Sequence, residues 1–541
     1  MNTYDLILII LCFVSSVGLA VVAYFTEKYR WGFWKYLYLI PLALTLLFLS
    51  VSGLDVCFIP LGIGVFFAVI GFLYDEKGKR YLGSAVLFAA TLVTLLMILF
   101  YPGYRLVRYD ENFDRAIAEL EEKYVLTEHK NIDFTALRDK YYPQFRKATK
   151  NRDKAMNAVL WWEFAAEFND GHVGYVTADT EASDAANAIL FGNDFGFATL
   201  KLDDGSFVAV SVDEGKVPFA NGTEILAIDG TPLSEIAANV TAPLITSPVS
   251  ENAEFYNSIL AGGNANDEIT VSYVDESGAA KEVKLAKCGR YFDRANMALE
   301  DIDTGANVGT LLFEKIDEKT VLYRVKQMMQ DAKTYGNSNY SDLKNIFTAG
   351  LEQYKAEGCD TLVIDLRGNG GGDPFMTLAF ASAIAPEGEH YYCSTGVIDD
   401  ETLEFVKDEN GRYVIGESLT YTGENLWDGD IIVLTNGRCV SAGDHFIKLV
   451  KDYPNVTVGG FTSSNSSGQA VSTIMIDDDS ELSYSAVPAM YEDGSPFVDA
   501  DADGNTGVGF DVKVPLDKEA VSALYDEGRD YVLEYMLNYV K

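Results

Sequence analysis

Four long apolar runs dominate the first hundred residues. Residues 6–25, 36–54, 56–74 and 81–104 contain no Lys, Arg, Glu or His. Each run can cross a hydrocarbon core of about 30 Å at about 1.5 Å per residue. Basic residues lie between the first and second runs and between the third and fourth, so the positive-inside rule predicts that the C-terminal part is outside the cell. We therefore expect a multi-pass protein of the cell membrane, anchored by a four-helix transmembrane region over residues 1–104. The alternative is four buried helices of a soluble core.

The pattern then becomes that of amphipathic helices over residues 105–185. Phe113, Ile117, Leu120 and Tyr124 recur at helical spacing, and Asp133 is a plausible N-cap for a second helix. A third helix is expected over about 153–168. It ends in an Asp-Gly-His turn, and a strand follows.

Two further regions complete the chain. Residues 186–290 alternate apolar and polar positions between turns, which predicts a β-rich insert. From 291 to 541 the pattern indicates a mixed α/β core, in which strands 308–313 and 361–366 flank a helix over 341–357. The expected organisation is thus a membrane region, a helical subdomain, a β insert and a C-terminal core.

Charge is distributed unevenly. The chain of 541 residues has a net charge of −38, but residues 1–104 hold 6 Lys+Arg and 5 Asp+Glu, so the remainder holds 36 and 75. An acid-rich C-terminal part argues against binding to nucleic acid. The six cysteines show no metal-type spacing.

Two strand–turn–helix units carry the candidate chemistry. The strand at 361–366 runs into a glycine-dense turn at 368–372, and the strand at 431–434 leads to Ser441 at the start of a helix. Both turns are expected at the carboxyl edge of one sheet, where sites form in α/β proteins. A serine at a helix N-terminus lies beside N–H groups that stabilise an oxyanion. Ser441 and Asp444 also have the spacing of a capping box, which would be purely structural.

The residues Thr361-Leu-Val-Ile-Asp-Leu-Arg-Gly-Asn-Gly-Gly-Gly372, followed 70 residues later by Val-Ser-Ala-Gly-Asp444, resemble peptidase family S41, the tail-specific and tricorn-like serine peptidases. The resemblance implies a ClpP/crotonase-like core with a helical preface. It also implies a PDZ-like insert, similar to the stretch 221–233, that could bind peptides by adding them to a sheet edge; a β insert that only packs is the alternative. Ser441 would be the nucleophile, and the N–H groups of Gly371 and Ala442 would form the oxyanion hole.

The general base departs from the commonest pattern of that family. Asn465 occupies the position where many members carry a lysine, and no lysine occurs between Lys451 and Lys513. The Asp-Gly-His turn resembles the histidine turn of tricorn-like members, which assigns the base to His172. His445, four residues after Ser441, is a rival, but it should point away from the oxyanion side.

A carboxylate should orient the histidine. The stretch around Asn505 to Asp511 resembles the C-terminal motif of the tricorn-like branch, although Gly504 replaces its glutamate, so Asp503 is the candidate partner. Asp499, Asp501 and Asp503 also have the opening spacing of a calcium loop, whose twelfth position is Phe510 rather than Glu. A solvated acidic turn is the third interpretation. No other cofactor is expected.

These expectations describe a membrane-anchored serine peptidase that acts outside the cytoplasm on peptide or protein substrates. The alternatives are a catalytically inactive, membrane-tethered protein that binds peptides or ligands, and a sensor or scaffold. The expected domains are residues 1–104, 105–185, 186–290 and 291–541.

Overall fold

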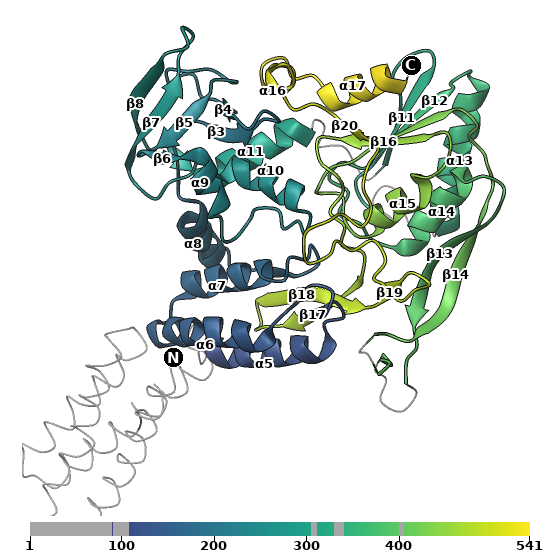
Figure 1. Ribbon diagram of the computed structural model, residues 1–541, viewed down its shortest axis with the longest axis horizontal. Helices are drawn as coiled ribbons and strands as arrows, with labels where there is room; N and C mark the ends of the chain where they lie inside the picture. Colours follow the sequence, from purple (N-terminus) through teal and green to yellow (C-terminus); the bar gives the residue numbers. More distant parts are fainter. Residues whose placement is uncertain are drawn as a thin grey trace, which may run out of the picture. The chain divides into compact units, whose positions relative to one another are not determined.

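The computed structural model describes Ala89 and residues 108–303, 311–328, 340–399, 405–409 and 412–540. The chain divides into two compact units: residues 1–113 with 142–157, and residues 114–141 with 158–541. The residues that form the candidate site belong to the second unit, whose elements are labelled in Figure 1.

The described helices are α5 (Tyr109–Lys123), α6 (Phe134–Asn151), α7 (Lys154–Ala166), α8 (Thr180–Phe191), α9 (Leu233–Ala238), α10 (Ser250–Leu260), α11 (Tyr291–Asp303), α13 (Tyr340–Ala356), α14 (Pro374–Ile384), α15 (Ala442–Val450), α16 (Lys518–Tyr525) and α17 (Tyr531–Val540).

The described strands are β1 (Gly174–Thr177), β2 (Asn193–Asp194), β3 (Ala198–Lys201), β4 (Phe207–Val210), β5 (Ile225–Ile228), β6 (Thr231–Pro232), β7 (Glu268–Val274), β8 (Ala280–Ala286), β9 (Gly289–Arg290), β10 (Leu311–Lys315), β11 (Thr320–Val325), β12 (Thr361–Asp365), β13 (Gly388–Gly396), β14 (Ile415–Gly423), β15 (Asp430–Leu434), β16 (Val456–Gly460), β17 (Ala470–Met475), β18 (Ser480–Val487), β19 (Ala489–Met490) and β20 (Val512–Lys513).

None of the helices that the structure describes could cross a membrane, because none is both long and apolar enough. Helix α6, for example, has 18 residues but carries Arg138, Lys140 and Lys147 among its charged positions. A span needs about 20 predominantly apolar residues. This finding corrects the expected four-helix transmembrane region and multi-pass membrane localisation. The predicted spans at 6–25, 36–54 and 56–74 lie outside the described residues, as does 81–104 apart from Ala89.

A six-stranded sheet forms the centre of the second unit. Its strand order is β10-β11-β12-β15-β16-β20, with β10 antiparallel to β11 and the other pairs parallel. Thr361 pairs with Thr320 on one side and with Asp430 on the other, so the carboxyl ends of β11, β12 and β15 lie together. The turns after β12 and β15 therefore meet at one edge of the sheet, as expected from the sequence.

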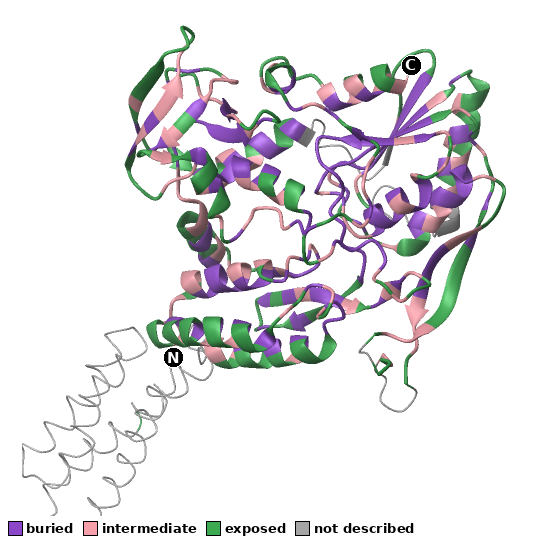
Figure 2. Cartoon of the chain, viewed as in Figure 1, coloured by how far each residue is buried: buried purple, intermediate pink, exposed green. Residues whose placement is uncertain are grey.

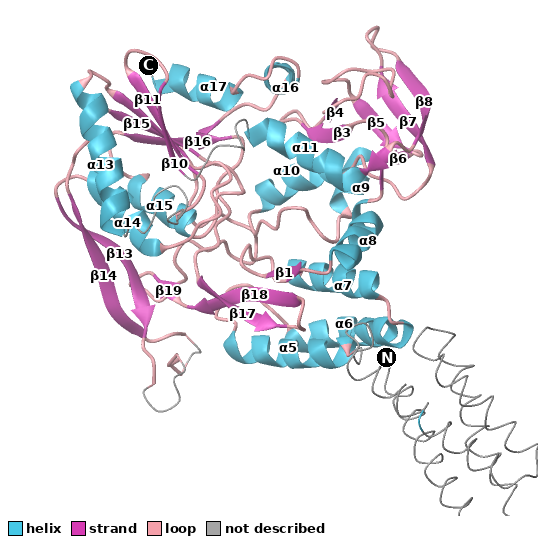
Figure 3. Cartoon of the chain, turned by 180° about the vertical axis from the view of Figure 1, so that it is seen from behind, coloured by secondary structure: helices cyan, strands magenta, loops and turns pink. Residues whose placement is uncertain are grey.

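Both faces of this sheet are covered. Leu362 and Ile364 of β12 pack with helices α13, α14 and α15, whereas Val363 packs on the opposite face in the cluster that contains α10, α11, α16 and α17. Successive side chains of a strand point to opposite faces, so a parallel strand buried on both sides needs an unbroken apolar run. Figures 1 and 3 show these helix groups from opposite sides, and Figure 2 shows the central strands as buried.

The helical preface follows the prediction closely. Asp133 caps α6, since its side chain accepts the N–H of Ala136 at 2.9 Å. The expected helix at 341–357 is α13. Strand β11, however, was not predicted. The strand expected at 308–313 corresponds to β10, which is antiparallel to β11. The parallel crossover to β12 therefore starts from β11 and not from β10.

The β-rich insert contains the hairpin β3–β4 and a four-stranded sheet of order β6-β5-β7-β8. Phe197, Ile225, Leu233 and Val271 belong to its own apolar cluster. Two three-stranded sheets, β1-β18-β17 and β14-β13-β19, and the two-stranded sheet β2-β9 also belong to the second unit. The described chain is thus a mixed α/β fold, and its predicted domain boundaries stay predictions.

Candidate active site

Ser441 lies between β15 and α15 in a strained backbone conformation. Its φ is 63° and its ψ is −122°, a region that residues with a Cβ atom rarely adopt. The surrounding chain holds it there: its N–H contacts the Asp444 carboxylate at 3.0 Å and the Ser467 carbonyl at 3.1 Å. Its own carbonyl accepts the N–H of His445 at 3.0 Å. Strain of this kind is found at functional sites, where the structure over-determines it.

Asp444 organises the backbone around this serine. It is fully buried, and its carboxylate accepts the N–H groups of Ser441, Ser466 and Ser467. Burial raises the pKa of Asp444 to about 7, and the N–H donors oppose the rise. The contact with the Ser441 N–H is the carboxylate half of the predicted capping box.

The glycine turn lies directly against Ser441. A Cβ atom at Gly371 would lie 2.5 Å from Ser441 Cβ and 2.8 Å from the Val440 carbonyl oxygen, and Gly371 has a φ of 79°. Only glycine fits there. Asn369 joins the two turns, because its carbonyl accepts the Val440 N–H at 2.9 Å. The sequence-predicted neighbours Gly371 and Ser441 are therefore together in the structure.

The N–H groups of Gly371 and Ala442, the two predicted oxyanion donors, differ in their hydrogen bonding. The Gly371 N–H donates to Asn369 Oδ1 at 2.8 Å. Ala442 is the first residue of α15. Its N–H is among the four at a helix start that have no acceptor within the helix. Gly371 must turn its N–H away from Asn369 before both groups can face one anion.

His172 lies in a buried turn between α7 and β1. Its N–H bonds to Asp170 Oδ1 at 2.9 Å, and its carbonyl accepts the hydroxyl of Ser483 at 2.9 Å. The ring nitrogen Nδ1 is buried and has no hydrogen-bond partner among the described residues. Burial lowers the pKa of His172, and the charge of Asp170 partly opposes this.

One loop joins the histidine turn to the serine turn. The Ser467 hydroxyl accepts the Gly171 N–H at 2.9 Å, while the Ser467 carbonyl accepts the Ser441 N–H at 3.1 Å. Asn465 supports the same junction: its Nδ2 donates to the carbonyls of Thr246 and Gly437, both at 2.9 Å. Among the described residues no hydrogen bond links the Ser441 and His172 side chains. The position of the family's lysine is thus occupied by a buried structural amide.

The carboxylate beside His172 is Asp170. It has no exposed surface, and its Oδ2 accepts the hydroxyls of Tyr124 at 3.0 Å and Ser485 at 2.8 Å. Asp503, the predicted partner, lies on an exposed turn, where its N–H bonds to Asp501 at 3.0 Å. The structure therefore brings Asp170 and His172 together and leaves Asp503 on the surface. The sequence offered one signal for this partner: Asp170 stands two residues before His172, a spacing at which an Asp side chain bonds to the backbone of its own turn.

A second acid lies behind Asp170. Asp499 is buried, its Oδ2 accepts Gln469 Nε2, and its Oδ1 has no partner among the described residues. Burial and the nearby charge of Asp170 raise the pKa of Asp499 to about 8. Lys130, whose Nζ donates to the Ala500 carbonyl at 2.6 Å, is the cation next to both acids.

The acidic side chains of the expected calcium loop lie in different surroundings. Asp499 faces the interior, whereas the Asp501 carboxylate accepts the backbone and side-chain N–H groups of Asn505 at 3.0 and 2.9 Å. No group of three or more metal-type side chains is found within the described ranges. Bound calcium stays a prediction that no measurement tests.

Both ring nitrogens of His445 have hydrogen-bond partners inside the fold. Its Nε2 bonds to the Gly468 carbonyl at 2.7 Å and its Nδ1 to the Tyr392 hydroxyl. Burial lowers the pKa of His445 to about 4. Both ring nitrogens are occupied, so this rival base has no free nitrogen for Ser441.

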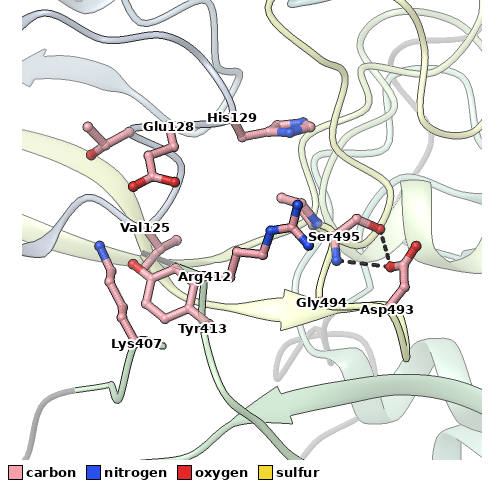
Figure 4. A pocket seen from close by; sticks show the side chains of 11 residues that line it. Val125, Glu128, His129, Lys407, Arg412, Tyr413, Asp493, Gly494 and Ser495 are labelled. Carbon is pink, nitrogen blue, oxygen red and sulfur yellow. Dashed lines mark hydrogen bonds between the residues drawn. The ribbon is translucent and has the colours of Figure 1, made fainter. Parts of the chain in front are cut away.

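Figure 4 shows a hollow elsewhere in the second unit, of about 380 Å³, lined by Glu128, Lys407, Arg412, Tyr413 and Asp493 among others. Its two cations face two carboxylates, and Asp493 is also bonded to Ser495 at 3.0 and 2.6 Å. Neither Ser441 nor His172 lines it. The balanced charges indicate no particular ligand.

Comparisons with known proteins found a family profile that matches part of the chain and solved structures with a similar fold. The profile of peptidase family S41 matches residues 324–514. Mature CPAF complexed with lactacystin is similar in structure, with 15% identity and a TM-score of 0.53 over 80% of this chain and 97% of that chain. A second structure of mature CPAF gives 14% identity and a TM-score of 0.54 over 80% and 96%. No curated protein matches the sequence. At this identity the likeness in structure shows the fold alone.

Proposed function

We propose that this chain is a serine peptidase that cleaves peptide bonds through an acyl-enzyme formed on Ser441. The match of residues 324–514 to the profile of peptidase family S41 supports this proposal. The observation that carries this proposal is the backbone of Ser441. Its strained φ of 63° occurs at the N-terminus of α15, beside a glycine that no larger residue could replace. A purely structural cap needs no such strain.

In the proposed reaction the Ser441 hydroxyl attacks the scissile carbonyl carbon. His172 takes the hydroxyl proton and later returns it to the leaving amine, and a water molecule then releases the acyl group. Burial lowers the pKa of His172 below its usual 6.5, which favours the neutral ring that can accept a proton. The missing Ser441–His172 hydrogen bond is compatible with this role, since catalytic bonds are often long before substrate binds.

The oxyanion would be stabilised by the N–H groups of Ala442 and Gly371. Removal of one such donor costs about 10²–10³ in rate. Asp170 supports His172 as a positioning residue: it holds the backbone of the histidine turn and supplies the nearest negative charge. We assign this role to Asp170 rather than to the exposed Asp503.

The test is labelling of the full-length protein with a serine-reactive fluorophosphonate, beside Ser441→Ala and His172→Ala. Wild type should take the label, and both substitutions should abolish labelling. Ser206→Ala, at a surface serine of the insert, is the control and should label like wild type.

Absence of label on folded wild type, as judged by its thermal unfolding, would contradict the acyl-enzyme mechanism. A chain that nevertheless binds peptides would then function as a binding protein. Labelling that survives Ser441→Ala would show that another residue is the nucleophile.

A further inference from the structure

A hollow of about 440 Å³ lies beside the His172 turn. Its walls come from α7, the start of β1, α8, the segment 242–246, α11 and Arg438. All these residues belong to the second compact unit. The volume lies within the range of about 300–1,000 Å³ that is typical of sites for small ligands.

Most of the lining residues are apolar, although Ser183, Asn187, Thr246, Asn296 and Arg438 add polar surface to the walls. Aromatic and aliphatic side chains from four different elements face the hollow, among them Trp162, Phe191, Leu244, Ile245, Phe292 and Leu299. Burying a large apolar side chain against the apolar part of these walls is favourable. Arg438 is the single charged residue in the lining.

The hollow is bounded by the neighbours of both catalytic candidates. Val173 and Gly174, which follow His172, line it, and so does Arg438, three residues before Ser441. Thr246 lines it as well, and its carbonyl accepts Asn465 Nδ2 from the loop that joins the serine and histidine turns. The hollow thus lies next to the His172 turn, and Arg438 connects its wall to the segment that leads to Ser441.

We propose that this hollow binds a large apolar side chain, aromatic or leucine-like, of the peptide substrate. Arg438 disfavours a basic residue at that subsite and favours an acidic residue next to it. The proposal rests on the proposed peptidase function and adds the substrate class. Small or basic side chains would leave the walls unfilled or place a cation against Arg438.

The first test uses a fluorogenic peptide series in which one position at a time is Phe, Leu, Ala, Asp or Lys. Full-length wild type should cleave peptides with Phe or Leu at one position about 10-fold or more faster, in kcat/KM, than those with Ala or Lys. Ser183→Phe, which fills the hollow from α8, should abolish this preference. Ala185→Phe, on the exposed side of the same helix, should retain it.

A second variant that fills the hollow from another helix shows whether an effect of Ser183→Phe comes from misfolding. Asn296→Phe fills the hollow from α11 and should have the same effect as Ser183→Phe. Arg438→Gln should keep the apolar preference and relax the discrimination against Lys. An unchanged Phe and Leu preference in folded Ser183→Phe and Asn296→Phe would overturn the proposal.

A measurement of peptide binding tests the pocket proposal separately from the proposed peptidase reaction. Full-length Ser441→Ala should bind a Phe-containing peptide at least about 10-fold more tightly than its Ala counterpart in calorimetry, and Ser183→Phe added to it should remove the difference. If wild type is inactive and this difference persists, the pocket proposal stands and the peptidase mechanism falls. If wild type cleaves all peptides equally and Ser441→Ala binds them equally, the mechanism stands and the pocket proposal falls.

Discussion

At the scale of single residues, the close contact between Gly371 and Ser441 leaves no room for a side chain at position 371. Gly371→Ala would bring a methyl group within 2.5 Å of Ser441 Cβ, at a φ of 79° that alanine adopts poorly. Ser441 or the glycine turn must then shift, and a misplacement of about 1 Å can cost about 10²-fold in rate.

We therefore expect Gly371→Ala to lower kcat at least about 100-fold. Gly370→Ala is the matched control, because no atom lies within 4 Å of a Cβ atom at that position. It should retain most of its activity in a peptide-hydrolysis assay. Equal activity of the two variants would show that the close packing of Gly371 against Ser441 does not matter for catalysis.

The pKa of His172 predicts a second behaviour. A base must be neutral to accept the serine proton, and burial lowers the pKa of His172 from its usual 6.5. The acidic limb of kcat/KM should therefore have its midpoint below pH 6.5. Because Asp170 raises this pKa, Asp170→Asn should move the midpoint to a still lower pH, as measured by a pH–rate profile. A shift to higher pH would exclude Asp170 as the charge that acts on His172.

At the scale of elements, the loop 465–468 determines how the histidine turn meets the serine turn. Asn465→Ala would leave the carbonyls of Thr246 and Gly437 without their side-chain donor and remove the acceptor of the Ser467 hydroxyl. An unpaired buried polar group costs about 1–3 kcal/mol.

We expect Asn465→Ala to lower both kcat and the melting temperature, because the loop positions Gly171 and Ser441 through Ser467. Asn239→Ala, at an exposed asparagine that bonds only to its own helix, should change neither. Calorimetry and steady-state kinetics on both variants provide the test. Full activity of Asn465→Ala would mean that the loop does not position the two turns.

The elements themselves were largely predictable. Apolar runs at 362–364 and 431–434 identified two buried strands, and helical spacing with the Asp133 cap identified the preface. Strand β11 was missed because its pairing with β12 depends on residues 41 positions apart, as in the Thr320–Thr361 pair, and local periodicity carries no such information. The expected transmembrane helices rested on hydropathy alone, and the finding on the described helices overturns them.

At the scale of the whole molecule, a buried ionic network connects the sheet edge with the C-terminal helix. Asp365 lies between Arg324 at 2.7 Å and Arg367 at 2.9 Å, and Arg367 also binds Asp530 at 2.8 and 2.6 Å. Burial alone would raise the pKa of Asp365, but the two arginines hold it well below its usual value.

Asp365→Asn should therefore destabilise the protein by about 3–5 kcal/mol, because it leaves two buried arginines with Asp530 as their one remaining carboxylate in this network. The folded pKa lies below the unfolded one, so the contribution of this carboxylate is present above about pH 4 and is lost as the pH falls further. Urea unfolding at pH 7 and at pH 3 measures both effects.

Asp360→Asn, which breaks an exposed ion pair with Lys319, should cost no more than about 1 kcal/mol. A similar small loss in Asp365→Asn would show that the network contributes little to stability.

The sequence alone determined the candidate nucleophile, the glycine turn and the histidine turn of this protein, since each is a short motif at the end of a predictable element. Only the tertiary structure decided their partners. Asp170 rather than Asp503 lies beside His172, and both ring nitrogens of His445 are bonded to Tyr392 and Gly468. Ser467 joins the turns of Gly171 and Ser441, which are 270 positions apart. The hollow beside His172 was equally invisible, because its walls come from six separate segments. Motifs follow from local chemistry, whereas contacts between distant segments follow from how the sheets and helices pack.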